Sequence, residues 1–180
     1  LSKRIELDGE GESGPEALAW GPAYHRIPAE PKIRDITIQG VSFLPTPWSV
    51  VPDPLDAKND VLFSGNGDLT TNTLVLRLDL SGETGAQLQF KTLYDIESHW
   101  DFAFMQVSRD GGQTWQSLSN PYTTYEHDPS AHPNVVANLP GLTGVSDGWV
   151  EMSFDLSEYD GEEILLAFRY ITDWAAEGNG

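Results

Sequence analysis

The sequence predicts an all-β domain whose antiparallel strands form two packed sheets or a barrel. Beyond Asp60, apolar residues recur at every second position in four separate segments, which is typical of strands with one buried face. Turn residues adjoin these segments, among them Ser81-Gly82-Glu83 and Tyr159-Asp160-Gly161. No convincing helix lies between the segments, so we expect successive strands to pair antiparallel.

Each of the four segments places apolar residues on one face. In the first, leucines alternate with Val75, Arg77 and Asp79, so the leucine face is expected to lie against the core. The expected strands span residues 74–80, 88–94, 150–156 and 164–170.

A fifth strand, Phe102 to Ser108, is apolar on both faces. Ala103, Met105 and Val107 occupy one face and the two phenylalanines the other, as in a central strand covered on both sides. One cover is the core of the sandwich, and the proline-rich N-terminal segment is a candidate for the second. An exposed aromatic strip is the less favoured alternative. Asp110-Gly111-Gly112 then predicts a tight turn into Thr114-Trp115.

The first part of the chain has a different character. It is rich in Gly and Glu over residues 9–21, and seven prolines interrupt residues 22–54. We expect residues 1–32 to be a linker or wrapped extension and residues 33–180 to form the sandwich domain. Residues 15–20 are the one helix candidate here, and short strands are expected at 33–38 and 41–44.

Charge and composition exclude several functions. The net charge of −18, from ten basic and twenty-eight acidic residues, argues against binding to nucleic acid or anionic membranes. Cysteine is absent, which excludes disulfides and thiolate chemistry. No apolar run of about eighteen residues is present, so we expect no membrane insertion. The chain starts at Leu1 with no recognisable leader, so we expect a fragment of a longer protein.

Motifs for catalysis do not have the structural context that they require. His127 and His132 flank Pro129, which blocks the helix on which a zinc peptidase would align two histidines. Residues 144–148, Gly-Val-Ser-Asp-Gly, match a nucleophile-elbow string but lead into a strand rather than a helix. Pairs of carboxylates are too common in so acidic a chain to indicate glycoside hydrolysis. We therefore assign no catalytic residue.

Acidic loops next to the expected strands favour a cation site instead. Calcium takes about six to eight oxygen ligands, and flexible loops supply them easily. If the strands pack as neighbours, these loops converge at one end of the sandwich. The alternative is that each residue serves only a turn. The candidate calcium ligands are Asn66, Asp68, Asp95, Glu97, Asp101 and Asp173.

Aromatic residues suggest a second kind of site. Carbohydrate-binding sandwiches stack exposed aromatic rings on sugars, and Trp100, Trp174 and Tyr125 are the loop residues best placed for such contacts. Trp115 and Trp149 border strands and are expected to seal the edge of the core.

Four segments follow one another in a characteristic order: YDIESHWDFAFMQVSRDGGQTW at 94–115, Gly-Leu-Thr-Gly at 141–144, Gly-Trp-Val at 148–150 and FDLSEYDGEEILLAFRYITD at 154–173. In this order and spacing they resemble the accessory β-sandwich domains of secreted bacterial metallopeptidases of the immune inhibitor A type. The resemblance covers roughly residues 43–180 and implies an antiparallel two-sheet jelly-roll sandwich that is MAM-like or galactose-binding-like.

The same resemblance implies a function. The family's peptidase site lies in a separate zinc domain, and its sandwich domains supply architecture, calcium binding and contacts to substrate or surfaces. We therefore expect a noncatalytic, calcium-stabilised domain that scaffolds or positions an exported bacterial protein, secreted or at the cell surface, with the parent's other domains as partners. A module that binds carbohydrate or a cell-surface protein is the alternative, and a hydrolase in its own right a third.

The sequence departs from the family at its end. Family members continue past the equivalent of Thr172-Asp173 through a glycine-containing loop into a final strand. Here the sequence ends in Glu177-Gly178-Asn179-Gly180, where that strand is expected to begin. Either the fragment lacks the strand or another chain supplies it, and an open sheet edge invites pairing.

Overall fold

The computed structural model describes residues 4–6, 24–26, 48–174 and 180. The chain divides into two units, residues 1–42 and 43–180. In the first, β1 (Arg4–Glu6) pairs in parallel with β2 (Tyr24–Arg26). The helix expected at 15–20 and the strands expected at 33–38 and 41–44 lie outside the described residues. The boundary expected between residues 32 and 33 stays a prediction.

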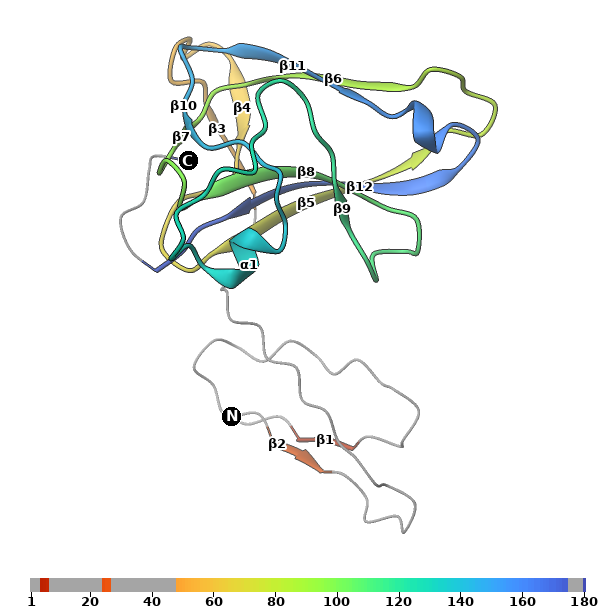
Figure 1. The fold of residues 1–180 in the computed structure, drawn as a ribbon, viewed down its shortest axis with the longest axis horizontal. Coiled ribbons are helices and arrows are strands. Elements are labelled where there is room, and N and C mark those ends of the chain that lie inside the picture. The colour runs from red at the N-terminus through yellow and green to blue at the C-terminus, as the bar shows by residue number, and fades with distance from the viewer. Residues whose placement is uncertain (1–3, 7–23, 27–47, 175–179) are drawn as a thin grey trace. The chain divides into compact units, whose positions relative to one another are not determined.

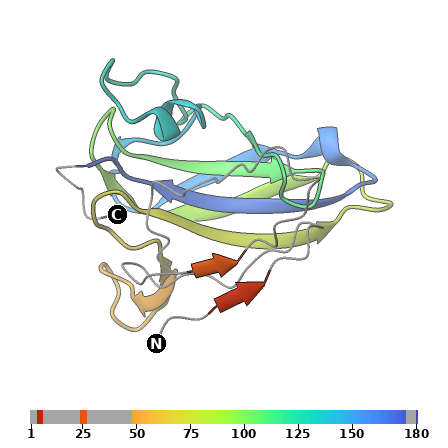
Figure 2. The same cartoon turned by 90° about the horizontal axis from the view of Figure 1, so that it is seen from below.

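The second unit is an antiparallel β-sandwich, which confirms the predicted fold class. Its larger sheet has the order β5 (Thr71–Asp79), β12 (Glu163–Ile171), β8 (Phe102–Ser108) and β9 (Gln116–Ser117). The facing layer is the pair β6 (Gln87–Thr92) and β11 (Val150–Asp155) (Figure 1). Figure 2 shows β5, β12 and β8 side by side along their length.

Short elements complete this unit. A hairpin joins β3 (Ser49–Pro52) to β4 (Asp60–Phe63), and β7 (Asp95–Ile96) pairs with β10 (Gly144–Val145). Among the described residues, the helical segments are α1 (Pro133–Val136) and the 3-10 turn Ser157–Tyr159.

All five expected strands form. β8 has the predicted bounds, and the other four differ from prediction by at most a few residues at their ends. The core between the layers is apolar, with Phe90 stacked on Phe154 at 6.1 Å and edge-on to Phe168 at 5.1 Å. Leu76 departs from the predicted burial of the leucine face, because it is 41% exposed. It lies where the two layers leave a groove, described below.

Both faces of β8 are covered, as its sequence predicts. Met105 and Val107 pack in the core between the layers. On the other face Phe102 and Phe104 are fully buried against Val135 of α1. Figure 1 shows α1 on the side of the larger sheet away from β6 and β11. The second cover that the structure describes is therefore the segment around α1. Most of the proline-rich N-terminal segment, the candidate named above, lies outside the described residues.

The turn after β8 forms as predicted and is held by hydrogen bonds to Asp110. The Asp110 carboxylate accepts hydrogen bonds from the Thr114 backbone N–H at 2.9 Å and from the Thr114 hydroxyl at 2.6 Å. These bonds lower the pKa of Asp110. Gly111 and Gly112 both adopt positive φ, which glycine allows without strain. The turn is thus hairpin chemistry that returns the chain into β9.

Phe104→Ala tests the importance of the second cover. Loss of this buried ring is expected to lower the free energy of unfolding by about 3–5 kcal/mol, because the surrounding residues cannot refill its space. Val145→Ala is the control, since Val145 is 71% exposed and its truncation should change the stability by at most about 0.5 kcal/mol. Urea denaturation measures both. Equal stability of the two variants would contradict a buried second face.

Candidate metal centre

The register of the larger sheet brings three distant chain segments to one end. Ile171, the last residue of β12, pairs with Thr71 on one side and with Phe102 on the other. The residues that precede β5, precede β8 and follow β12 must therefore meet. Asp68, Asp101 and Asp173 occupy those positions, each one to three residues beyond the strands.

Local hydrogen bonds bring Glu97 to the same place. The Glu97 carbonyl accepts from the backbone N–H groups of Trp100 at 3.3 Å and Asp101 at 3.1 Å, which closes a turn. The Thr143 hydroxyl donates to this carbonyl at 3.1 Å and accepts from the His99 N–H at 2.9 Å. His99 itself has a φ of 71°. The loop therefore folds back on itself, with Glu97 and Asp101 adjacent.

The turn before β5 is tied to the end of β12. The Leu69 N–H donates to the Asp173 carbonyl at 2.5 Å, and the Thr70 N–H donates to the Thr172 hydroxyl at 2.9 Å. That hydroxyl donates in turn to the Gly67 carbonyl at 2.6 Å. These bonds hold the 67–70 turn, and Asp68 with it, against the segment that carries Asp173.

Three carboxylates converge at this end. Glu97, Asp101 and Asp173 each offer one oxygen, and the three oxygens lie within 4.8 Å of one another. Asp101 is 1% exposed and Asp173 is 3% exposed. The Asp173 N–H donates to Asp101 Oδ1 at 2.8 Å, whereas Glu97 Oε2 is buried and has no hydrogen-bond partner among the described residues. A buried carboxylate oxygen without a partner is costly unless a cation reaches it.

Electrostatics at the cluster follow from this crowding. Burial is the main cause that raises the pKa of Asp101 to about 7, and the charges of Asp173, Glu97 and Asp68 add to it. The hydrogen bond from the Asp173 N–H opposes the shift without cancelling it. Burial, followed by the charges of Asp173 and Asp68, also raises the pKa of Glu97. The protein surroundings disfavour the charged forms, and a bound cation would reverse that preference.

The six candidate ligands thus separate into groups. Glu97, Asp101 and Asp173 meet, and Asp68 is exposed but close enough for its charge to act on two of them. Asn66 is exposed in the loop before β5 and is not part of the carboxylate group.

Asp95 lies outside the cluster. It belongs to β7, where its backbone exchanges two hydrogen bonds with Gly180, each 3.1 Å long.

The candidate ligand-contact aromatics are dispersed. Trp174 is 51% exposed and meets His132 edge-on at 5.4 Å, and Tyr125 is 68% exposed. Trp100 is partly buried in the turn that follows Glu97. Among the described ring contacts, none joins two of these three side chains. Their role in binding carbohydrate or a surface protein stays a prediction.

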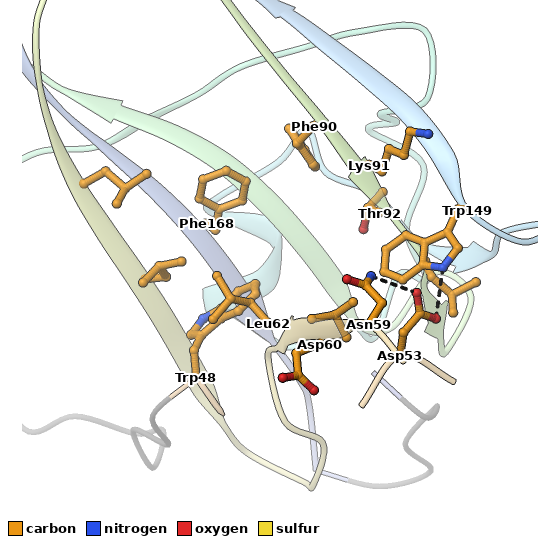
Figure 3. A pocket seen from close by; sticks show the side chains of 14 residues that line it. Trp48, Asp53, Asn59, Asp60, Leu62, Phe90, Lys91, Thr92, Trp149 and Phe168 are labelled. Carbon is orange, nitrogen blue, oxygen red and sulfur yellow. Dashed lines mark hydrogen bonds between the residues drawn. The ribbon is translucent and has the colours of Figure 1, made fainter. Parts of the chain in front are cut away.

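A groove of about 830 Å³ is a feature that the sequence did not predict (Figure 3). Trp149 borders it and donates through Nε1 to Asp53 Oδ1 at 3.2 Å, and Asn59 donates to the other oxygen of Asp53 at 3.2 Å. Trp48 and Phe168, in edge-on contact at 6.3 Å, line another part of it. The six tryptophans of the chain were the available sequence signal for such an aromatic surface. Their spacing along the chain did not show which rings share it.

Fold and site define a class of protein, an antiparallel β-sandwich module with a carboxylate cluster at one end of its larger sheet. Within the described residues, that cluster is the single group of three or more acidic or histidine side chains placed to hold a metal, and it has no histidine. No helix in the described part of the chain is long and apolar enough to span a membrane.

The family of the chain is the immune inhibitor A-like MAM domain family, to which it belongs because the model of that family matches residues 54–180. Pre-pro-metalloprotease PrtV of Vibrio cholerae is similar, with 32% identity over 111 residues, 62% of this chain. Immune inhibitor A of Bacillus thuringiensis subsp. alesti is 32% identical over 119 residues, 66% of this chain. The matches span 11% and 15% of the lengths of these two relatives.

The raised pKa of Asp101 predicts how the metal-free protein responds to pH. A carboxyl group whose pKa is 3.8 when unfolded and about 7 when folded contributes stability that is fully present below pH 3.8 and is lost as the pH rises through 7. With a chelator present, this group should lower the free energy of unfolding by up to about 1.4 kcal/mol per pH unit between these values. Urea denaturation at several pH values measures the slope.

Asp101→Asn should flatten this slope, because the amide oxygen still accepts from the Asp173 N–H but the side chain no longer titrates. Asp110→Asn is the matched control. Hydrogen bonds lower the pKa of Asp110, so its stabilising effect is lost only at acid pH and the slope above pH 4 should be unchanged. A slope that is the same in Asp101→Asn and in the unmodified protein would contradict the prediction.

Proposed function

We propose that this chain is a noncatalytic accessory domain of an exported bacterial metallopeptidase, and that a calcium ion stabilises it at the carboxylate cluster. The observation that carries the cation site is the convergence of Glu97, Asp101 and Asp173, two of them almost fully buried, together with a buried Glu97 oxygen that has no hydrogen-bond partner among the described residues. Asp68 adds negative charge from the neighbouring turn.

Calcium fits these ligands better than other metals. The donors are carboxylate oxygens from loops, which is the chemistry of calcium and magnesium, whereas zinc and copper sites favour histidine or cysteine. Calcium also accepts irregular geometry and six to eight ligands, so backbone carbonyls and water can complete its shell around three carboxylates. Magnesium would require near-octahedral geometry and usually keeps several waters of its own.

The role of the ion would be architectural. Its ligands come from the loop before β8 and from the segment after β12, so one ion joins segments that are more than seventy residues apart in sequence. A ligand that binds only the folded state stabilises it. The domain would then hold a fixed shape beside a catalytic domain and position it. The two relatives named metalloprotease and immune inhibitor A support this context.

Export suits the proposed site. Calcium sites of extracellular modules have dissociation constants of about 0.1–1 mM, an affinity range that few carboxylates can provide. The large negative charge of the chain favours cation binding and solubility as well. The alternative function, recognition of carbohydrate or a cell-surface protein, has weaker support because Trp100, Trp174 and Tyr125 do not share a described ring contact.

Calcium should raise the melting temperature of the unmodified protein. At a hundredfold excess over the dissociation constant, the gain in folding free energy is about 2.7 kcal/mol, which corresponds to several degrees for a domain of this size. Differential scanning calorimetry with calcium and with chelator measures the shift, and isothermal titration calorimetry should give one ion per chain.

Substitution of single carboxylates tests where the ion binds. Glu97→Gln and Asp173→Asn should each abolish most of the calcium-dependent rise in melting temperature, because each removes a charged ligand. Asp95→Asn is the matched control, since Asp95 is acidic and lies two residues from Glu97 but outside the cluster. Its shift should equal that of the unmodified protein. If the melting temperature does not respond to calcium, or if Asp95→Asn removes the response while Glu97→Gln retains it, the proposed site is wrong.

A further inference from the structure

Asn66 lies in the loop between β4 and β5 and is directly followed by a glycine. Within the described part of the chain it is the one asparagine in such a pair. The Asn66 side chain is exposed, and neither this side chain nor the Gly67 N–H has a hydrogen-bond partner among the described residues. These are the two groups that react when an asparagine cyclises onto the main chain, so no hydrogen bond has to break before they meet.

The loop is anchored on both sides of this pair. On the side of β4, the Asn72 side chain donates to the Ser64 carbonyl. On the side of β5, the Gly67 carbonyl accepts from the Thr172 hydroxyl at 2.6 Å. The backbone is therefore held before and after the Asn-Gly pair, while the reactive amide and the reactive N–H are left unbound.

Glycines flank Asn66 on both sides and free the backbone around it. Gly65 has a φ of 81° and Gly67 a φ of 118°, angles that glycine adopts without strain. A side chain on the residue after an asparagine would crowd the ring that forms between the two residues, and Gly67 has none. The local backbone thus has the freedom that ring closure needs.

The other described asparagines each lack one of these conditions. Asn59 is exposed, but its side chain donates to a carboxylate at 3.2 Å. Asn120 precedes a proline, which has no N–H. The backbone N–H that follows Asn134 is hydrogen-bonded at 2.9 Å in the first turn of α1. The remaining two are Asn72, within β5, and Asn138, whose side chain donates to a backbone carbonyl.

We propose that Asn66 is a site of spontaneous deamidation in the folded domain. The Gly67 nitrogen attacks Cγ of Asn66 and closes a succinimide ring. The side-chain nitrogen leaves as ammonia, carrying the proton that Gly67 loses. Water then opens the ring at either carbonyl, which leaves aspartate or isoaspartate at this position. The sum of the steps is the hydrolysis of one amide, with water as the second reactant.

Either product changes the end of the larger sheet. Aspartate places a further negative charge two residues before Asp68, in a protein that already has a large negative charge. Isoaspartate also adds one carbon to the main chain, directly before the Gly67 carbonyl that is tied to Thr172. A longer main chain has to displace this tie or the turn that follows it. The proposal does not depend on the cation site.

Peptide mass spectrometry of the full chain, incubated at mildly alkaline pH in chelator, tests the modification. The fragment ion containing Asn66 should gain the mass difference between OH and NH₂, at a rate about tenfold or more above that of the other described asparagines. An isoaspartyl methyltransferase should label the same fragment, because isoaspartate forms only through the ring.

Asn66→Gln should abolish both signals, since the longer side chain closes a larger ring less readily. Asn59→Gln is the matched control, because Asn59 is also exposed and its replacement should leave both signals at position 66 unchanged. A fragment that keeps its mass, or one that gains mass no faster than the other described asparagines, would overturn the modification.

The effect on the loop is measured separately. The isoaspartate form, isolated by ion exchange, should melt about 2 °C or more below the variant Asn66→Asp in chelator. Both proteins carry the added charge, but only the isoaspartate form has the longer main chain. Equal melting temperatures would overturn the inferred strain at the tie to Thr172.

Discussion

The antiparallel register of β5, β12 and β8 is the constraint on which the rest of the structure depends. Because Ile171 lies between Thr71 and Phe102, three loops from distant parts of the sequence end at one place. The same register sets the faces of β8, with Met105 toward the core and Phe104 toward α1. A slip of one residue would exchange these faces and scatter the carboxylates, so core packing also maintains the acidic cluster.

Packing and charge are opposed at this end of the sheet. The phenylalanines after Asp101 bury apolar area, whereas Asp101 and Asp173 bury negative charge beside Glu97. Removing carboxylates from water is unfavourable unless something compensates them. The hydrogen bond from the Asp173 N–H to Asp101 compensates in part. A domain selected only for stability would not place acids here, and this is the physical reason to connect the cluster with a cation.

Sequence patterns predicted local structure well and long-range geometry in part. Period-two alternation located the strands, and Asp110-Gly111-Gly112 located a turn, because both signals act over a few residues. Which of the six candidate ligands lie together could not be predicted, since side-chain direction within a loop leaves no periodic signal; the fold brings Glu97, Asp101 and Asp173 to one place. Asp95 and Glu97 are two residues apart, yet Asp95 belongs to β7, which pairs with β10, and Glu97 belongs to the cluster.

The groove is a second feature that the sequence did not predict, because it depends on long-range geometry. Leu76 has the sequence pattern of a core residue, but whether a second layer covers it depends on a strand far away in sequence. Trp149 likewise has the pattern of a residue that seals a strand end, and it is a partly buried residue of the groove wall. That it also shares a wall with Trp48 requires three-dimensional information. Pairing partners of a strand edge are the part of a β-sandwich that a sequence specifies least.

Because Asp101 lies directly before β8, the charged loops of the domain adjoin its best-buried strand, and the two differ in how readily proteases can cut them. Among the strands whose burial the structure describes, β8 is the most completely buried, so cleavage there requires the sheet to open. The loops at its acidic end need much less opening, and repulsion among Glu97, Asp101 and Asp173 would favour that opening whenever their charges are uncompensated. The first cuts would then fall between residues 64 and 70 or 97 and 101. If the proposed calcium ion binds there, its removal would expose these loops to cleavage first.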